Sequence, residues 1–171
     1  MNAMTELRYP IELEQPDILA LMPHRGDIQC VHSVRILSSN HFVGQVLWRG
    51  DLPMLQGHFP GMPVVPGALL VEAAAQVAGA GMLAGDPCAR SMGADHIGML
   101  AGIRKCTFKA PVLPDQEVEV EIHTRQMTPT AAQVAAELRV AGEEVATVDI
   151  LVVNLPKQDV MDRIQARSAQ P

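Results

Sequence analysis

A histidine in a stiff loop and a carboxylate in an apolar segment are the groups of this chain best placed for acid–base chemistry. Between positions 57 and 67, three prolines and three glycines surround His58, so the backbone there is stiff and can approach a ligand closely. From Gly67 to Ala84 the sequence is almost entirely apolar, which predicts a helix buried on every side, and Glu72 is its only charge. An ionised carboxylate in such surroundings is costly unless it is paired. We therefore interpret Glu72 as a residue kept for chemistry; the alternative is a buried structural partner for an arginine.

Two polar groups beside this pair extend the predicted site. Gln76 lies four residues after Glu72, on the same helical face, and could hydrogen-bond its carboxyl group or a water between them. Pro66 and Gly67 mark the start of the helix, where free backbone N–H groups and the positive end of the helix dipole favour an oxyanion. A base, an acid and an oxyanion donor are thus expected within one short segment.

These residues resemble the active-site segment of the β-hydroxyacyl-(acyl carrier protein) dehydratases. The pattern is His-Phe-Pro-Gly-x-Pro-x-x-Pro-Gly at positions 58–67, followed by Glu72 and Gln76. Leu-Met-Pro-His-Arg at 21–25 and the segment 100–114 extend the resemblance over most of the chain. The related dehydratase–isomerases carry aspartate where this chain has Glu72, so the chain is more similar to the dehydratase-only branch, with isomerase activity left open.

The resemblance implies dehydration of β-hydroxyacyl thioesters on acyl carrier protein to trans-2-enoyl thioesters, in fatty acid or related lipid or polyene biosynthesis. His58 would remove the α-proton, and Glu72, kept protonated by its apolar setting, would protonate the departing hydroxyl group or orient the water that does so. The Gly67 N–H would bind the thioester carbonyl oxygen. The carbonyl of Val64 would orient the His58 ring, and Gln76 is assigned to hydrogen bonding rather than to chemistry.

The resemblance also implies an assembly, in which His58 and Glu72 of one site come from different subunits of a homodimer and three dimers could associate further. Sequence spacing alone does not indicate this. Four apolar residues are predicted to line an acyl tunnel: Phe59, Met62, Met99 and Phe108. The other histidines have no comparable setting and are treated as non-catalytic: His24, His32, His41, His96 and His123.

The implied fold is an α+β hotdog, in which an antiparallel sheet wraps around a long central helix. Residues 1–155 are assigned to one such domain and 156–171 to a polar extension, whose Val160, Met161 and Ile164 could form one face of a short helix. Strand-like runs are predicted at 28–36, 41–48, 97–103, 107–112, 118–125, 131–140 and 145–153, with a short helix at 16–21. In the run from 118, valine and isoleucine alternate with glutamate, which predicts one wet face.

The composition restricts the classes of binding partner and the cellular location expected for this protein. A net charge of −6 argues against nucleic acid. Arg104, Lys105 and Lys109, with Arg25 as a possible addition, form a basic cluster that we assign to docking of an acidic acyl carrier protein; the alternative is a solvated strand edge. The apolar helix contains a carboxylate and several glycines, which disfavours a membrane span, and no signal peptide is visible, so a cytoplasmic location is expected.

No cofactor or metal is expected. The chain has no glycine-rich phosphate loop after a strand, and its three cysteines have neither metal-ligand nor redox spacing, so neither zinc nor a disulfide is predicted.

Departures from the family pattern leave the substrate range open. Gly26-Asp27-Ile28 and His32-Ser33 replace the usual Tyr-Pro-Phe and Asp-Arg. Two other functions are considered: a hotdog thioesterase, for which His58 and its proline frame would be superfluous, and a non-catalytic acyl-thioester-binding subunit, which would not need an acid–base pair.

Overall fold

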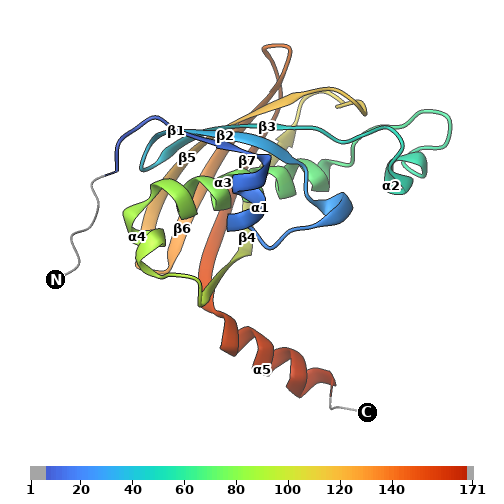
Figure 1. Ribbon diagram of the computed structural model, residues 1–171. Helices are drawn as coiled ribbons and strands as arrows, with labels where there is room; N and C mark the ends of the chain where they lie inside the picture. Colours follow the sequence, from blue (N-terminus) through green and yellow to red (C-terminus); the bar gives the residue numbers. More distant parts are fainter. Residues whose placement is uncertain (1–6, 169–171) are drawn as a thin grey trace.

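A seven-stranded antiparallel sheet packs around one long helix, α3 (Gly67–Gly85), in the computed structural model, which describes residues 7–168 (Figure 1). The strand order is β1-β2-β3-β5-β6-β7-β4, so the short β1 and the long β4 form the two edges. The strands are β1 (Ile11–Glu14), β2 (Val31–Ser38), β3 (His41–Val46), β4 (His96–Phe108), β5 (Val118–Thr128), β6 (Ala131–Val140) and β7 (Glu143–Pro156). The other helices are α1 (Gln15–Leu21), α2 (Pro53–Gln56), α4 (Pro87–Ser91) and α5 (Lys157–Ser168). This arrangement confirms the predicted α+β hotdog fold.

Glycine residues let α3 lie very close to the sheet, where it packs against β2, β3, β5, β6 and β7. A Cβ atom added at Gly44 of β3 would lie 2.5 Å from Val77 Cγ2, and one added at Gly81 of α3 would lie 2.4 Å from the ring of Phe42. Both Val77 and Phe42 are completely buried. Because neither glycine has room for a methyl group, the two together set the depth at which the helix lies in the sheet.

The two faces of the sheet differ in polarity, as the sequence of β5 predicts. Val118, Val120 and Ile122 are fully buried on the face that meets α3. Glu119 and His123, which alternate with them, are exposed on the opposite face. The alternation follows from the two-residue period of a strand, so the wet face expected for this strand is confirmed.

Two predicted strand limits are wrong. The run predicted at 97–103 and the first two residues of the run predicted at 107–112 belong to one strand, β4, because the polar residues between them lie exposed at the edge of the sheet and do not interrupt the pairing with β7. Residues 109–112 lie outside the strands. The strand predicted from Ile28 begins at Val31, because Gly26–Ile28 forms a 3-10 turn in which Gly26 has a φ of 65°. Strand β1 and helices α2 and α4 were not predicted; each is too short to show a period.

The expectation that α3 is buried on every side is wrong for one face. Glu72, Ala75, Gly79 and Leu83 are only partly buried, and their spacing of three or four residues places them on the same side of the helix. The helix is long and apolar enough to span a membrane, yet 61% of its apolar window is buried within the protein. It is therefore a core helix with one accessible stripe.

Helix α5 follows β7 directly and projects away from the body (Figure 1). Strand β7 runs through Pro156, one residue past the predicted domain limit. The predicted amphipathic residues Val160, Met161 and Ile164 lie in α5, and the last two are exposed. Residues 1–6 of the predicted domain and 169–171 of the predicted extension lie outside the described residues.

Gly81→Ala should lower the free energy of unfolding by roughly 1–3 kcal/mol, because the new methyl group would overlap the buried ring of Phe42. Gly79→Ala is the matched control, since its methyl group meets only the flexible end of Met22 and alanine favours the helix. Urea unfolding of both variants measures the difference. Equal stability of the two would show that α3 can shift without cost.

Candidate active site

The loop that carries His58 is fastened to the rest of the fold on both sides. The Asp115 N–H donates to the Trp48 carbonyl at 2.8 Å, and the Val65 N–H donates to the Val112 carbonyl at 2.8 Å. Leu55, in α2, is completely buried. The loop and α2 form a projection next to the start of α3 (Figure 1). These contacts hold the loop in one position.

His58 makes two reciprocal hydrogen bonds with Val64. The Val64 N–H donates to the His58 carbonyl at 2.7 Å, and the Val64 carbonyl lies 3.0 Å from Nδ1 of the His58 ring. A neutral ring that donates from Nδ1 keeps its lone pair on Nε2, where it can accept a proton. The ring of Phe59 stacks on the imidazole with centroids 4.3 Å apart. The His58 ring is therefore held in one orientation by its backbone partner and by Phe59.

Glu72 is positioned by the buried amide of Gln76, which is 3% exposed. Gln76 Nε2 donates to Glu72 Oε1 at 2.7 Å and to the Ile28 carbonyl at 2.8 Å. Gln76 Oε1 in turn accepts the Cys30 S–H at 3.8 Å. Every polar atom of the amide has a hydrogen-bond partner, so rotation of the Gln76 amide would break these bonds. The Glu72 carboxyl group is therefore held by a fixed donor.

Burial, followed by the nearby charge of Glu72, raises the pKa of the Cys30 thiol to about 12. The thiol is therefore protonated at neutral pH and remains a hydrogen-bond donor to Gln76. Cys30, Cys88 and Cys106 are free thiols. Cys30 is a structural residue that fixes which end of the Gln76 amide faces Glu72.

His24 approaches the same carboxyl group, although it had no predicted role. Its Nε2 lies 3.4 Å from Glu72 Oε1, and its Nδ1 is buried with no hydrogen-bond partner within residues 7–168. The Arg25 guanidinium fixes the backbone there by donating to the carbonyls of Met22 and His24 at 2.6 and 2.7 Å. The position of His24 in the Leu-Met-Pro-His-Arg segment was the sequence signal that could have identified it.

Glu72 faces a cavity of about 390 Å³ bounded by α1, the accessible stripe of α3 and the first half of β4. Its apolar lining includes Leu21, Met22, Met82, Leu83, Met99 and Val152. Its polar lining includes His24, Arg25, Glu72, Gln76, Asn154 and Lys157. A mostly apolar hollow with a few convergent polar groups suits a ligand with an apolar chain and a polar end. Lys157 begins α5, which the sequence treated as an extension rather than as part of a site.

The first residue of α3 is a glycine, and an aromatic ring packs against it. The Gly67 N–H belongs to the first turn, so no earlier turn of the helix supplies an acceptor for it. A Cβ atom added at Gly67 would lie 2.9 Å from Cζ of Phe108. The aromatic ring thus lies against the end of the helix where a developing negative charge is best stabilised.

The predicted site residues fall into two groups within a single chain. The first group, which lines the cavity, is Arg25, Glu72, Gln76 and Met99. The second group, on the loop, at the start of α3 and at the end of β4, is His58, Phe59, Met62, Val64, Gly67 and Phe108. Three of the four predicted tunnel residues are in the second group, where Phe59, Met62 and Phe108 are 52%, 65% and 51% exposed. Within residues 7–168 of a single chain, His58 therefore does not reach the cavity that Glu72 lines.

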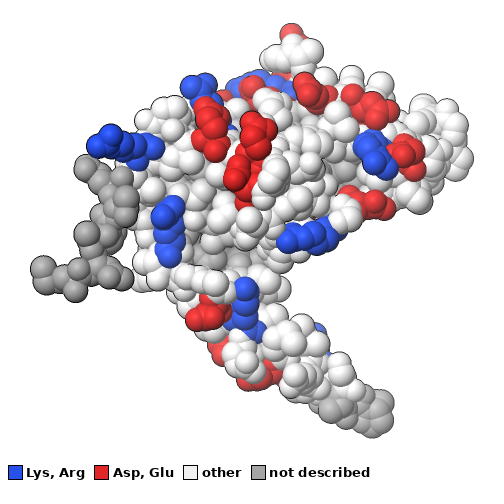
Figure 2. All heavy atoms as spheres, viewed as in Figure 1, with Lys and Arg blue, Asp and Glu red and all other residues white. Residues whose placement is uncertain are grey.

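The basic residues predicted to dock a carrier also lie apart. Arg25 lines the cavity, whereas Arg104, Lys105 and Lys109 lie exposed on or just after β4. Arg104 is 3.9 Å from Asp149, and Lys109 pairs with Glu144. Figure 2 shows acidic and basic side chains interspersed over the face seen there.

Sequence comparisons match this chain to known dehydratases. Residues 23–149 match the model of the FabA-like domain family. The 3-hydroxyacyl-(acyl carrier protein) dehydratase FabZ of Sinorhizobium medicae is 32% identical over 84% of this chain and 91% of the relative. The enzyme of the same name from Caldanaerobacter subterraneus is 30% identical over 82% of this chain and 97% of the relative.

Comparisons of structures agree on the fold. The dehydratase heterocomplex ApeI:P of Xenorhabdus doucetiae contains a chain that aligns with a TM-score of 0.68 at 18% identity, covering 92% of this chain and 99% of that chain. A thioesterase superfamily member from Thermus thermophilus aligns with a TM-score of 0.60 at 17% identity, covering 78% of this chain and 93% of that chain. At these identities the structures show only the hotdog architecture. The family match over most of the sequence, together with relatives of similar length, shows that the chain belongs to the FabA-like family of 3-hydroxyacyl-(acyl carrier protein) dehydratases.

Proposed function

We propose that this dehydratase removes water from β-hydroxyacyl thioesters carried by acyl carrier protein and releases trans-2-enoyl thioesters. The observation that carries the proposal is the pairing of His58 with Val64, which leaves Nε2 free to act as a base. The FabZ relatives, whose name includes both the 3-hydroxyacyl group and the acyl carrier protein, support the same substrate class.

In the proposed reaction, His58 Nε2 takes the α-proton and the C–H electrons form the new double bond. Glu72 donates a proton to the β-hydroxyl group, which leaves as water. The Gly67 N–H binds the thioester carbonyl oxygen, where negative charge develops as the α-proton leaves. After the reaction His58 carries one extra proton and Glu72 lacks one. His58 then releases its proton to solvent and Glu72 takes one up from solvent, so both groups return to their starting states.

Glu72 has neighbours that suit the role of an acid. The contacts from Gln76 and His24 both use Oε1, which leaves Oε2 for the substrate hydroxyl group. A neutral His24 that carries its ring hydrogen on Nε2 can donate to Oε1. That contact would hold the carboxyl group with Oε2 available to the substrate hydroxyl group. His24 acts in this proposal as a positioning residue.

We infer that one active site takes its base and its acid from two copies of the chain. Within one chain His58 is not among the described residues that line the Glu72 cavity. Strand β4 is the edge of the sheet, and its Met99, Leu100 and Ile103 are 42%, 44% and 57% exposed. A long edge with exposed apolar side chains favours pairing with another strand. A homodimer paired along β4 would cover these residues, and three such dimers could associate further.

We assign carrier docking to Arg104, Lys105 and Lys109, with Arg25 at the cavity. These side chains follow the same edge strand that would border a shared site, and the carrier is acidic. Their ion pairs with Asp149 and Glu144 are partly exposed, so exchange for a carrier carboxylate costs little. An enzyme that meets such a carrier would work in the cytoplasm.

His58→Ala and Glu72→Gln should each lower the rate of enoyl thioester formation by about 10²–10⁴-fold, the usual contribution of a general base or acid. The measurement is the mass and absorbance change of β-hydroxybutyryl and β-hydroxydecanoyl carrier thioesters. His32→Ala is the control, because His32 is exposed on β2 and lies outside the cavity. Release of free acid by the unaltered protein would instead indicate a thioesterase, and absence of any reaction would indicate an acyl-binding subunit.

Mixing the His58→Ala and Glu72→Gln chains should restore about a quarter of the original rate, because random association makes half of the dimers hybrid and each hybrid has one intact site of two. The two inactive chains are co-expressed in equal amounts, purified together through a tag that both carry, and assayed after the tag is removed. A mixture as inactive as its components would contradict the shared site.

Arg104→Glu combined with Lys105→Glu should raise KM for the carrier-bound substrate about tenfold at low salt, because like charges then face the acidic carrier. KM for the same acyl group on a short pantetheine analogue should not change. Arg35→Glu, at an exposed position on β2, is the matched control. If the double substitution left KM for the carrier-bound substrate unchanged, docking would have to occur elsewhere on the protein.

A further inference from the structure

A cluster of metal-ligating side chains lies on the outer face of the sheet, opposite α3 and unused by the proposed reaction. It consists of His41 at the start of β3 and of Glu121 and His123 on β5. The pairing of the two strands places His41 directly opposite His123, and Glu121 lies two residues before His123 on the same face. The backbone ladder therefore brings the three side chains together.

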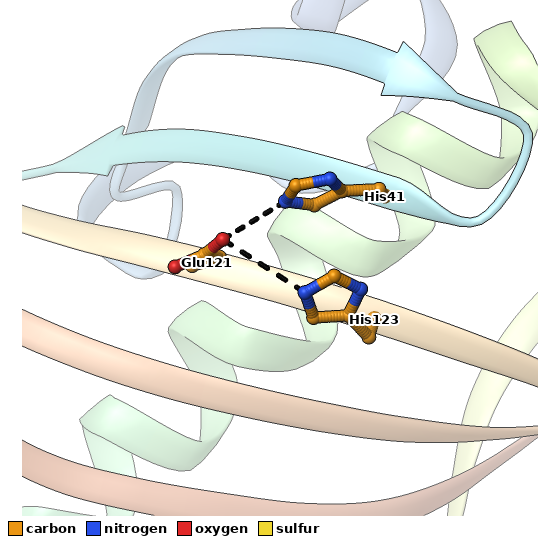
Figure 3. A group of neighbouring side chains, drawn as sticks. All are labelled: His41, Glu121 and His123. Carbon is orange, nitrogen blue, oxygen red and sulfur yellow. Dashed lines mark hydrogen bonds and ion pairs between the residues drawn. The ribbon is translucent and has the colours of Figure 1, made fainter.

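Three ligand atoms converge in this cluster. His41 Nε2 lies 2.9 Å from Glu121 Oε1, and His123 Nε2 lies 3.8 Å from the same oxygen (Figure 3). All three atoms lie within 4.8 Å of one another. The two imidazole rings stack with centroids 4.2 Å apart and planes 23° apart, so both present the same edge to the carboxylate. Zinc bonds of about 2.0–2.2 Å separate neighbouring tetrahedral ligands by about 3.3 Å, so the ligand atoms would shift little, while the stacked rings would rotate until both ring planes contain the ion.

The charges around the cluster suit a divalent cation. Arg139 Nη1 donates to Glu121 Oε2 at 2.8 Å, which leaves Oε1 to the histidines. Glu119, 4.0 Å from Arg139, and Glu137, which also pairs with it, offset the arginine charge. The group of three glutamates and one arginine therefore keeps a negative balance.

We propose that His41, Glu121 and His123 bind one divalent transition-metal ion, of which Zn²⁺ is the probe, and leave one coordination position to solvent. Two imidazoles and one carboxylate are a donor set that zinc commonly takes together with a water molecule. Glu121 and His123 also line a surface hollow of about 360 Å³, which gives water access to the site. Arg139 would act as an outer partner that orients the carboxylate. The bound ion would join β3 to β5.

Calorimetric titration of untagged, chelator-treated protein with Zn²⁺ tests the proposal. One ion per chain is expected, and His41→Gln and His123→Gln should each weaken binding at least about tenfold, since loss even of an outer partner costs 10–100-fold. His32→Gln is the matched control: an exposed histidine on a neighbouring strand, outside the cluster. Circular dichroism checks that all three variants are folded.

Thermal unfolding provides a second measurement. Zn²⁺ at a hundredfold excess over its dissociation constant should raise Tm by roughly 5–10 °C in the unaltered protein and in His32→Gln, but not in the two cluster variants. Replacing Zn²⁺ by Co²⁺ should give a visible spectrum of nitrogen and oxygen ligation without a thiolate band. Affinity unchanged by the cluster substitutions, a thiolate band, or no binding to the unaltered protein would each overturn the proposal. None of these readouts depends on dehydratase activity.

Discussion

The close contact between α3 and the sheet is the constraint on which the rest of the structure depends. Gly44 and Gly81 leave no room for a methyl group between the two layers, so the helix is fixed both in depth and in rotation. That rotation turns Gln76 into the core and Glu72 to the accessible stripe. The Glu72 carboxyl group faces the cavity because the opposite side of α3 can pack against the sheet in only one way.

Hydrogen bonds from a buried amide then orient Glu72. A buried amide must find partners for all its hydrogen-bonding atoms, and Gln76 finds them in Ile28, Cys30 and Glu72. The high pKa of Cys30 keeps its proton in place at neutral pH. A buried thiol, which does no chemistry in the proposed reaction, thus contributes to the position of the group that does. His58 is oriented differently, by two hydrogen bonds with Val64 in a loop that is anchored to the sheet.

The sheet separates two chemical environments by the simple alternation of its strands. Its inner face is apolar and holds α3, and its outer face carries the ionic network centred on Glu121. Binding of a ligand on the outer face can therefore influence the strands without occupying the Glu72 cavity. Strand β4 differs from the other long strands because it lies at the edge of the sheet. A second copy of the chain could cover its free edge and its exposed apolar residues.

The sequence by itself determined the fold class, the central helix and the identity of the catalytic candidates. The proline and glycine frame around His58, and a single carboxylate in an apolar helix, are local patterns that restrict backbone and charge before any tertiary contact forms. The single long β4 was missed, because an edge position tolerates polar residues that look like a break in a strand.

Only the tertiary structure decided which residues meet. His24 comes within reach of Glu72, and His41 within reach of Glu121 and His123, through packing and strand register. The separation of His58 from the Glu72 cavity within one chain is likewise set by how the loop is fastened. Long-range contacts of this kind depend on the whole fold, and no local spacing of residues encodes them.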